Sequence, residues 1–255
     1  MTDLKIGAHV PNADPIGEAA ARGADVVQIF VSNPQQWKKP IPRADAEQLR
    51  DAAIDIYVHA PYLLNLASPN NRVRIPSRKM LAQTVEASAL IGAKGVIVHG
   101  GSVGSDEDVD VGFERWFKAL DSFDVTVPVL VENTAGAGNT VMQNLDNYGP
   151  LWAAIGDLNV GVCLDTCHAW AAGADLATAV ERIAQYTGGI ALVHANDSRD
   201  PFNSHRDRHA NFGNGEIPEE LLVASIRDAN APVVVETPGG AEDQAADIAW
   251  LRERL

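Results

Sequence analysis

The sequence is poor in basic residues relative to its acidic content. Its 255 residues include 20 Lys and Arg against 34 Asp and Glu, which gives a formal net charge of -14 at pH 7. This balance excludes a protein that binds nucleic acid through a globally basic surface, although it leaves room for local basic patches.

Long apolar runs and cysteines are also scarce. No run approaches the roughly 18 residues of a membrane-spanning helix, and residues 1–7 lack the basic and apolar regions of a signal peptide. We therefore expect a cytoplasmic protein with no membrane attachment, and a monomer, which requires no special interface. The two cysteines, Cys163 and Cys167, cannot build a disulfide framework. We expect both to be buried near the end of a strand.

Short β-branched segments alternate with segments of helical spacing along the whole chain. The apolar pattern predicts eight strands, at 4–10, 26–32, 56–62, 95–101, 128–134, 160–168, 190–198 and 232–238. Helical spacing predicts eight helices, at 16–22, 44–53, 77–91, 111–122, 142–155, 176–186, 219–229 and 244–254. We predict a single (β/α)8 TIM barrel over residues 1–255, with an open doubly wound sheet as the structural alternative. A glycine-rich Gly-x-Gly-x-x-Gly turn after a strand is lacking, which argues against a dinucleotide-binding domain.

Histidines and carboxylates gather where the predicted strands end. In a barrel these ends form one rim, which carries the active site. Six such residues end strands, one follows a turn later, and two lie in the loop after the seventh strand: His59, His99, Glu132, Asp165, His194 and Glu236, then His168, then Asp207 and His209. Carboxylates converging in an apolar barrel mouth need cations between them.

The mixture of imidazole and carboxylate donors predicts which cations bind. It favours Zn²⁺ and related ions over Mg²⁺ or Ca²⁺, which prefer oxygen ligands. Nine donors are too many for one tetrahedral ion. With one bridging carboxylate, they would supply two or three ions.

Long ordered motifs give the sequence a more specific resemblance. They are KIGAHV at 5–10, NPQQW at 33–37, HAPYLLNLA at 59–67, ENTAG at 132–136, LDTCHAWAAG at 164–173, HANDS at 194–198, and DRH at 207–209 followed by GNG at 213–215. In these motifs the chain resembles the endonuclease IV family of zinc-dependent apurinic/apyrimidinic endonucleases, over nearly its full length.

The resemblance implies a trinuclear zinc site. The three ions would be held by His59, His99 and Glu132; by Glu132, Asp165, His194 and Glu236; and by His168, Asp207 and His209. Glu132 would bridge two ions and act as the catalytic carboxylate. The family's reaction would be implied too: a hydroxide held between the metals attacks the phosphate 5' of an abasic site in double-stranded DNA. The products are a 3'-hydroxyl and a 5'-deoxyribose phosphate.

The same resemblance implies residues that contact DNA. Tyr62 and Leu63 would enter the duplex where the abasic nucleotide is turned out, since a sugar without a base loses little stacking. Trp37 lies on a matching loop, with packing of that loop as the alternative role. Familiar members carry an arginine two residues before this Trp, where the chain has Gln35. Among the basic residues expected near the rim, we select Arg72 and Arg208 as phosphate contacts.

Two further functions compete with this interpretation. A divalent-metal sugar isomerase or epimerase on the same barrel would need Glu132, Asp165, His194 and Glu236, but would not need the remaining donors or a Tyr-Leu wedge. A non-catalytic protein that binds damaged DNA and keeps zinc for structure would be expected to have a closed, Cys-rich site instead. Outside the ligand set, we expect His9 to hydrogen-bond a ligand and His205 to lie in an exposed loop.

Overall fold

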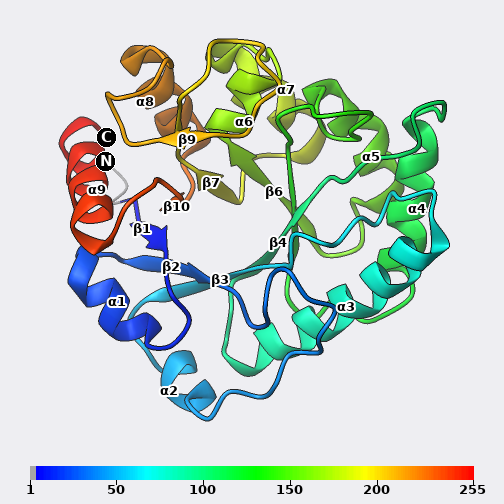
Figure 1. The fold of residues 1–255 in the computed structure, drawn as a ribbon, viewed down its shortest axis with the longest axis horizontal. Helices are drawn as coiled ribbons and strands as arrows, with labels where there is room; N and C mark the ends of the chain where they lie inside the picture. Colours follow the sequence, from blue (N-terminus) through cyan, green and yellow to red (C-terminus); the bar gives the residue numbers. More distant parts are fainter. Residues whose placement is uncertain (1–3) are drawn as a thin grey trace.

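Parallel strands close into a barrel in the computed structural model, which describes residues 4–255 (Figure 1). Around the barrel the strand order is β1-β10-β7-β6-β5-β4-β3-β2. The bounds are β1 (Ile6–His9), β2 (Val26–Ile29), β3 (Asp55–His59), β4 (Gly95–His99), β5 (Val129–Glu132), β6 (Val160–Asp165), β7 (Leu192–His194) and β10 (Val233–Val235). Each lies within or overlaps one of the eight predicted strands, so the predicted (β/α)8 barrel is confirmed and the open sheet was wrong.

Helices surround this barrel on its outside (Figure 1). They are α1 (Pro15–Arg22), α2 (Ala46–Arg50), α3 (Asn71–Leu90), α4 (Asp110–Leu120), α5 (Tyr148–Ile155), α6 (Thr166–Ala171), α7 (Leu176–Thr187), α8 (Glu219–Ala229) and α9 (Ala241–Arg254), with a 3-10 turn η1 (Leu145–Asn147). None of the helices described within residues 4–255 has the length and apolar character needed to cross a membrane.

Polar caps in the sequence set several of these bounds. The side chain of Asp14 accepts a hydrogen bond from the N–H of Gly17 at the start of α1, and Gly23 ends that helix with φ 61°. Asp175 caps α7 in the same way, and Gly188 ends it with φ 83°. These positive φ values lie in the left-handed region, which glycine adopts without steric cost.

Four predicted elements need correction. The strand expected at 190–198 is divided, because only Leu192–His194 belongs to the barrel, and Asp197–Ser198 pairs in a separate two-stranded sheet. The strand expected at 160–168 ends at Asp165, because this side chain accepts a hydrogen bond from the N–H of His168 and starts α6. The helix expected at 77–91 begins earlier, at Asn71, and includes Pro76. Arg72, which lies before the helix expected at 77–91, is therefore in the first turn of α3. The helix expected at 142–155 is divided into η1 and α5.

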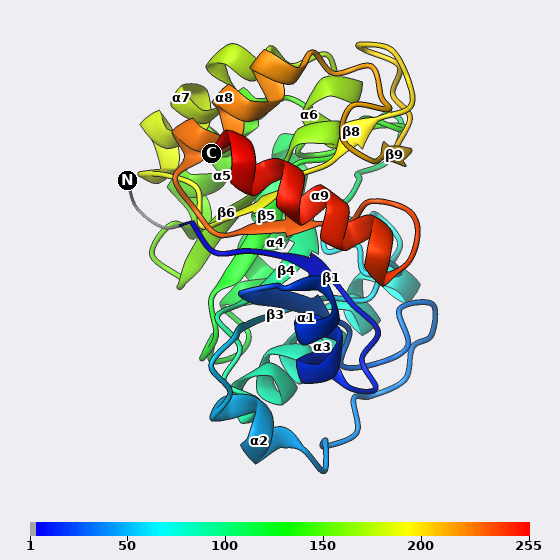
Figure 2. The same cartoon turned by 90° about the vertical axis from the view of Figure 1, so that its left-hand side faces the viewer.

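A short antiparallel hairpin, β8 (Asp197–Ser198) with β9 (His209–Ala210), extends the chain beyond β7. Figure 2 shows it at the end of the barrel towards which β1 points. The hairpin therefore brings His209 to the carboxyl-end rim. Cys163 in β6 and Cys167 in α6 are buried and free, as expected, although Cys167 lies in a helix.

Candidate metal centre

The alternating direction of side chains along the barrel strands places the candidate ligands together. Successive side chains of a strand point to opposite faces, so residues two apart share the barrel interior. A buried apolar layer crosses the barrel at Val26, Tyr57, Ile97, Leu130, Cys163, Leu192 and Val234. Two residues further along each strand, at the carboxyl end, stand Gln28, His59, His99, Glu132, Asp165, His194 and Glu236. In β1 the corresponding pair is Gly7 and His9. The site is thus a ring of eight polar side chains above an apolar plug.

A first cluster consists of His59, His99 and Glu132, whose donor atoms all lie within 4.8 Å of one another. Oε2 of Glu132 is 3.4 Å from Nε2 of His59 and 3.3 Å from Nε2 of His99. Glu132 is fully buried. Its Oε2 atom nevertheless accepts no hydrogen bond from residues 4–255, and an unsatisfied buried carboxylate oxygen is costly.

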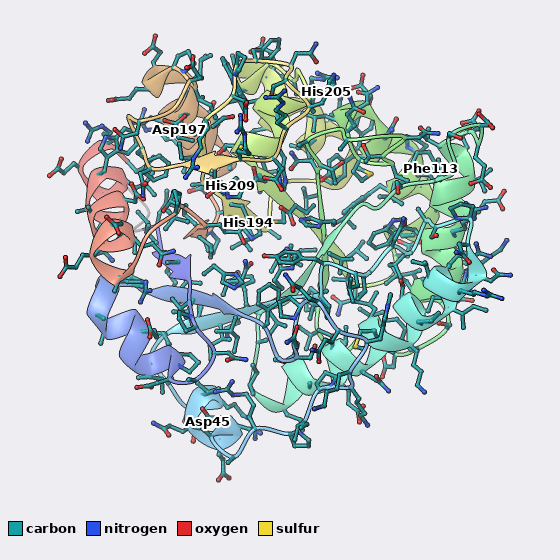
Figure 3. The ribbon with its side chains drawn as sticks, viewed as in Figure 1. Asp45, Phe113, His194, Asp197, His205 and His209 are labelled. Carbon is teal, nitrogen blue, oxygen red and sulfur yellow. The ribbon has the colours of Figure 1, made fainter. Side chains whose placement is uncertain are left out.

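A second cluster consists of Glu132, Asp165, His194 and Glu236, also within 4.8 Å. Nδ1 of His194 lies 3.2 Å from Oε1 of Glu132 and 3.3 Å from Oε2 of Glu236. Glu132 therefore presents one oxygen to each of the first two clusters. Figure 3 shows His194 inside the ring of helices, near His209.

A third cluster consists of His168, Asp207 and His209. Asp207 lies 3.2 Å from Nε2 of His168 through Oδ2, and 3.1 Å from Nε2 of His209 through Oδ1. Its side chain is 54% exposed, so this cluster opens to solvent. The groups whose donor atoms all lie within 4.8 Å of one another are here Asp165 with the two histidines, and Cys167 with Asp207 and His209. The sequence interpretation did not include Cys167 among the possible donors.

Hydrogen bonds orient three of the imidazoles through their Nδ1 atoms. Nδ1 of His59 bonds the carbonyl of Ala60 at 2.6 Å, Nδ1 of His168 bonds that of Asn133 at 3.0 Å, and Nδ1 of His209 bonds that of Glu236 at 3.2 Å. A carbonyl can only accept, so each Nδ1 carries the proton and each Nε2 is free to donate a lone pair. In all three residues Nε2 faces a carboxylate of the clusters.

Burial and neighbouring charges shift the pKa values of several candidate ligands. Burial opposes ionisation of Glu132, but the His99 and His194 imidazoles and the hydrogen bonds from His168 and His194 outweigh it, holding its pKa well below the usual range. Burial lowers the pKa of His99 to about 4. Burial also disfavours a charged His209, yet Asp207, Asp165 and Glu236 raise its pKa to about 9.

The clusters have donor sets that could hold metal ions. Imidazole nitrogens are mixed with carboxylate oxygens, which suits Zn²⁺ better than ions that prefer oxygen alone. Two buried donor atoms, Oε2 of Glu132 and Nε2 of His209, lack a hydrogen-bond partner within residues 4–255. A cation in the first cluster would satisfy Oε2 of Glu132, and one in the third cluster would satisfy Nε2 of His209.

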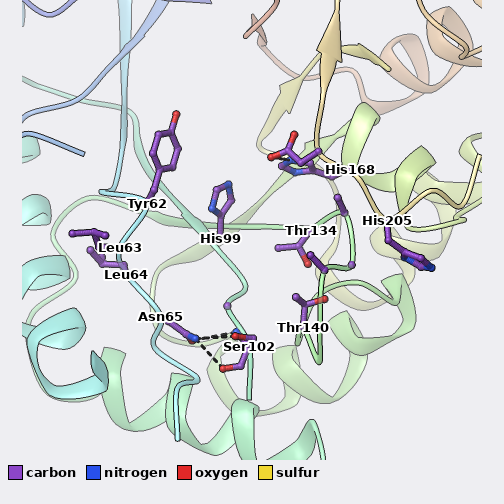
Figure 4. Close-up of a pocket in the computed structure, with 15 residues that line it drawn as sticks. Tyr62, Leu63, Leu64, Asn65, His99, Ser102, Thr134, Thr140, His168 and His205 are labelled. Carbon is purple, nitrogen blue, oxygen red and sulfur yellow. Dashed lines mark hydrogen bonds and ion pairs between the residues drawn. The ribbon is translucent and has the colours of Figure 1, made fainter. Parts of the chain in front are cut away.

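A cavity of about 300 Å³ opens beside the first and third clusters (Figure 4). Tyr62, His99 and His168 line it, and Asn65 holds its floor by donating hydrogen bonds to the carbonyl oxygen and hydroxyl of Ser102 at 2.9 and 3.0 Å. A substrate group in this cavity would therefore lie directly against the candidate ligands.

Comparisons with known proteins identify the family. A model described as a xylose isomerase-like TIM barrel matches residues 16–254. The chain is 58% identical over 252 residues to the probable endonuclease 4 of Mycobacterium ulcerans, covering 99% of both chains. It is 55% identical over 251 residues to that of Mycobacterium leprae, covering 98% of this chain and 99% of the relative. The crystal structure of endonuclease IV from Thermus thermophilus matches with a TM-score of 0.84 at 31% identity, covering 98% of each chain. The chain belongs to the endonuclease IV family.

The likeness of this chain to a sugar-epimerase-like structure concerns the fold alone. The structure of a D-tagatose 3-epimerase-like protein matches with a TM-score of 0.82, but at 21% identity, covering 98% of this chain and 97% of that one. Such a likeness indicates the barrel and not the reaction.

Residues expected to contact DNA surround the same rim. Tyr62 is 52% exposed and its ring lies 5.2 Å from that of His59, while Leu63 beside it is half-buried. Gln35 and Trp37 are exposed on the loop after β2. These side chains are accessible to a duplex that approaches the rim.

The two selected arginines and two other histidines have distinct surroundings. Arg72 is exposed on α3, and Arg208 is exposed before β9. The Nε of Arg208 donates to Asp200 at 2.6 Å, so its guanidinium is held by an ion pair. His205 is exposed, as expected. His9 lies in β1, with Nδ1 3.6 Å from Oε1 of Glu236.

Three buried amides, those of Asn133, Asn196 and Gln28, support the candidate ligands and were missed by sequence reasoning. Asn133 bonds both backbone groups of Asp165, accepting from its N–H at 2.8 Å and donating to its carbonyl at 3.0 Å. Asn196 donates to Oδ2 of Asp165 at 2.8 Å and accepts from the N–H of Glu236 at 2.9 Å. Gln28 is the third. Asn133 and Asn196 follow ligands in the sequence, which was the available signal.

Proposed function

We propose that this protein cleaves the phosphodiester bond on the 5' side of an abasic site in double-stranded DNA. The cut leaves a 3'-hydroxyl and a 5'-deoxyribose phosphate, and three zinc ions take part. Membership of the endonuclease IV family supports the nuclease activity. The zinc ions and their number are supported by two donor clusters that share one buried carboxylate, Glu132, and by the position of Asp207 between His168 and His209 beside them.

The position of Glu132 between two clusters is the observation that best supports this proposal. Its Oε2 atom faces two imidazoles of the first cluster, and its Oε1 atom faces His194 in the second. A carboxylate placed in this way can bridge two cations and reduce the repulsion between them. The third cluster adjoins it, because Nδ1 of His168 lies 3.2 Å from Oε1 of Glu132.

The protein's own residues would prepare this site for phosphate chemistry. Bonds from Nδ1 to backbone carbonyls hold His59, His168 and His209 so that Nε2 stays available as a ligand. The chemistry that zinc supplies when bound is a lowered pKa of coordinated water and stabilisation of charge on the attacked phosphate. The cysteines give no alternative nucleophile, since burial raises the pKa of both Cys163 and Cys167 to about 12.

Selection of the abasic site would come from the rim. Tyr62 and Leu63 stand beside the cavity and next to His59, where an apolar wedge could replace the unstacked nucleotide. A nucleotide without a base is the one that costs least to turn out of the duplex. The net charge of -14 is offset where phosphate binds, since three zinc ions add +6 at the clusters.

An incision assay tests the proposal. The purified protein is stripped with a chelator, dialysed and restored with Zn²⁺, then incubated with a duplex carrying one abasic site and with the intact duplex. We expect a zinc-dependent cut of the abasic strand only, with a 3'-hydroxyl that a DNA polymerase can extend. A protein that cuts neither duplex after zinc is restored, or cuts both equally, contradicts the proposal.

A further inference from the structure

Gln28 is the amide in the ring of eight polar side chains that closes the barrel mouth. It lies in β2, two residues after Val26 of the apolar layer, and it is fully buried. Its neighbours in the ring are titratable or candidate ligands. A buried amide requires partners for its two N–H groups and its oxygen.

The side chain of Gln28 bonds three members of the ring. Its Nε2 group lies 2.7 Å from Oε1 of Glu236 and 2.8 Å from Nδ1 of His9. Its Oε1 atom lies 2.7 Å from Nε2 of His194. All three contacts have hydrogen-bond length, so both N–H groups and the oxygen are used.

The carboxylate of Glu236 fixes which way this amide points. Rotation of the amide by 180° would place its oxygen 2.7 Å from a carboxylate oxygen, two acceptors without a hydrogen between them. In the orientation that remains, Oε1 of Gln28 must accept from His194. Nε2 of His194 is therefore protonated. Nδ1 also hydrogen-bonds Oε1 of Glu132 at 3.2 Å, so a cation bound by His194 would displace the proton on Nδ1 and leave the one on Nε2.

His194 thus differs from the other oriented imidazoles of the site. His59, His168 and His209 carry the proton on Nδ1, held by backbone carbonyls. His194 presents Nδ1 to the second cluster, 3.2 Å from Glu132 and 3.3 Å from Glu236. The thiol of Cys163 also lies beside His194, but sulfur is a weak acceptor.

We propose that Gln28 is a positioning residue for the second cluster, which holds His194 in the Nε2–H tautomer and turns Oε2 of Glu236 towards the same point. The inference rests on the proposed zinc sites. Partners of this kind, outside the ligand set, typically change metal affinity by about 10- to 100-fold when they are removed. Because a side chain supplies the contact, a substitution can remove it without changing the backbone.

Two variants and a control separate positioning from a structural role. Gln28→Leu removes every bond, whereas Gln28→Glu keeps an acceptor for His194 but loses the donors to Glu236 and His9. Gln244→Leu is the matched control, because Gln244 is another buried glutamine. Its side chain bonds Arg22 at 2.6 Å and the backbone carbonyls of Thr237 and His9 rather than a ligand side chain.

The experiment combines zinc competition with NMR. A chromophoric chelator competes for zinc in each protein, and long-range ¹⁵N–¹H correlations report the protonated nitrogen of His194. We expect Gln28→Leu to weaken one zinc equivalent about 10- to 100-fold and to lose the Nε2–H signal. Gln28→Glu should keep that signal yet still bind this equivalent more weakly, and Gln244→Leu should match the parent in both measurements.

The parent protein provides a test that needs no variant to fold. A His194 protonated on Nδ1 in the zinc-loaded parent overturns the inference, as does a Gln28→Leu protein that binds all its zinc with parental affinity. Failure of the parent to bind zinc at all would overturn the proposed function with it, so the two failures are distinguishable.

Discussion

Oε2 of Glu132 lies 3.3 Å from Nε2 of His99, its register partner on the neighbouring strand. The parallel pairing of β4 with β5 sets these two side chains on one face at the same height. The pairing of the two strands therefore places these two candidate ligands side by side without a cation. Because Glu132 also faces His194, loss of its charge should affect two clusters together.

The first prediction concerns the negative charge of Glu132. Glu132→Gln should reduce bound zinc by about two equivalents, since the bridging carboxylate offsets the repulsion between cations. Incision of abasic DNA should fall by more than the roughly 10- to 100-fold typical of partners outside the ligand set. Metal analysis, an incision assay and circular dichroism check the change, with Glu114→Gln on the exposed face of α4 as control. Full activity of the Glu132 variant with a folded barrel would contradict the bridging role.

The second prediction separates the wedge from the metals. Replacing Tyr62 and Leu63 by Ala should weaken incision of abasic duplex much more than hydrolysis of a small phosphodiester, since the pair acts on DNA distortion. Tyr186→Ala is the control, because this tyrosine is similarly exposed at the end of α7. Equal losses on the two substrates would mean that Tyr62 and Leu63 only support the site structurally.

The third prediction addresses Gln35, where the resemblance to the family implies an arginine. Gln35→Arg should tighten binding to abasic duplex and steepen the salt dependence by about 0.9, the slope expected for one added phosphate contact. Binding across a salt series measures this, in a Glu132→Gln background that prevents turnover. Gln185→Arg on α7 adds the same charge away from the rim and should leave the slope unchanged. An unaltered slope in the Gln35 variant would show that this loop does not approach DNA.

The fourth prediction concerns the proton that His209 binds when no metal is present. The pKa of His209 is raised from 6.5 to about 9, despite burial, by Asp207, Asp165 and Glu236. Its charged form therefore stabilises the metal-free fold below about pH 6.5, and this contribution is lost as the pH rises through about 9. Zinc must displace the proton, so its apparent affinity should increase over the same interval.

Proton release on zinc addition measures this competition directly. A pH indicator in weak buffer should record more protons released per zinc at pH 7 than at pH 9. Thermal unfolding of the stripped protein should show decreasing stability across the same range. Equal proton release at both pH values would refute the assignment of His209 as a ligand.

Much of the rim could be predicted from sequence, because strand ends and ligands coincide. His59, His99, Glu132, Asp165 and His194 end their strands in the structure. In a parallel barrel every such end reaches the same rim, so the ligand candidates followed without knowledge of strand order.

Features that depend on register or on very short elements could not be predicted. Gln28 lies inside the segment 26–32, and only the alternation from Val26 in the closed barrel shows that it faces the ligands. The β8–β9 hairpin has strands of two residues, too short to carry a pattern. Its pairing brings His209 near His168 on α6, a placement that the resemblance implied and local sequence did not.

Stepwise reconstitution tests the central claim most directly. The metal-stripped protein is titrated with zinc while bound metal and incision 5' of an abasic site are measured on the same samples. The account predicts that activity rises to its maximum as the third equivalent binds. Full activity with one equivalent bound, or no incision with three bound, would contradict it.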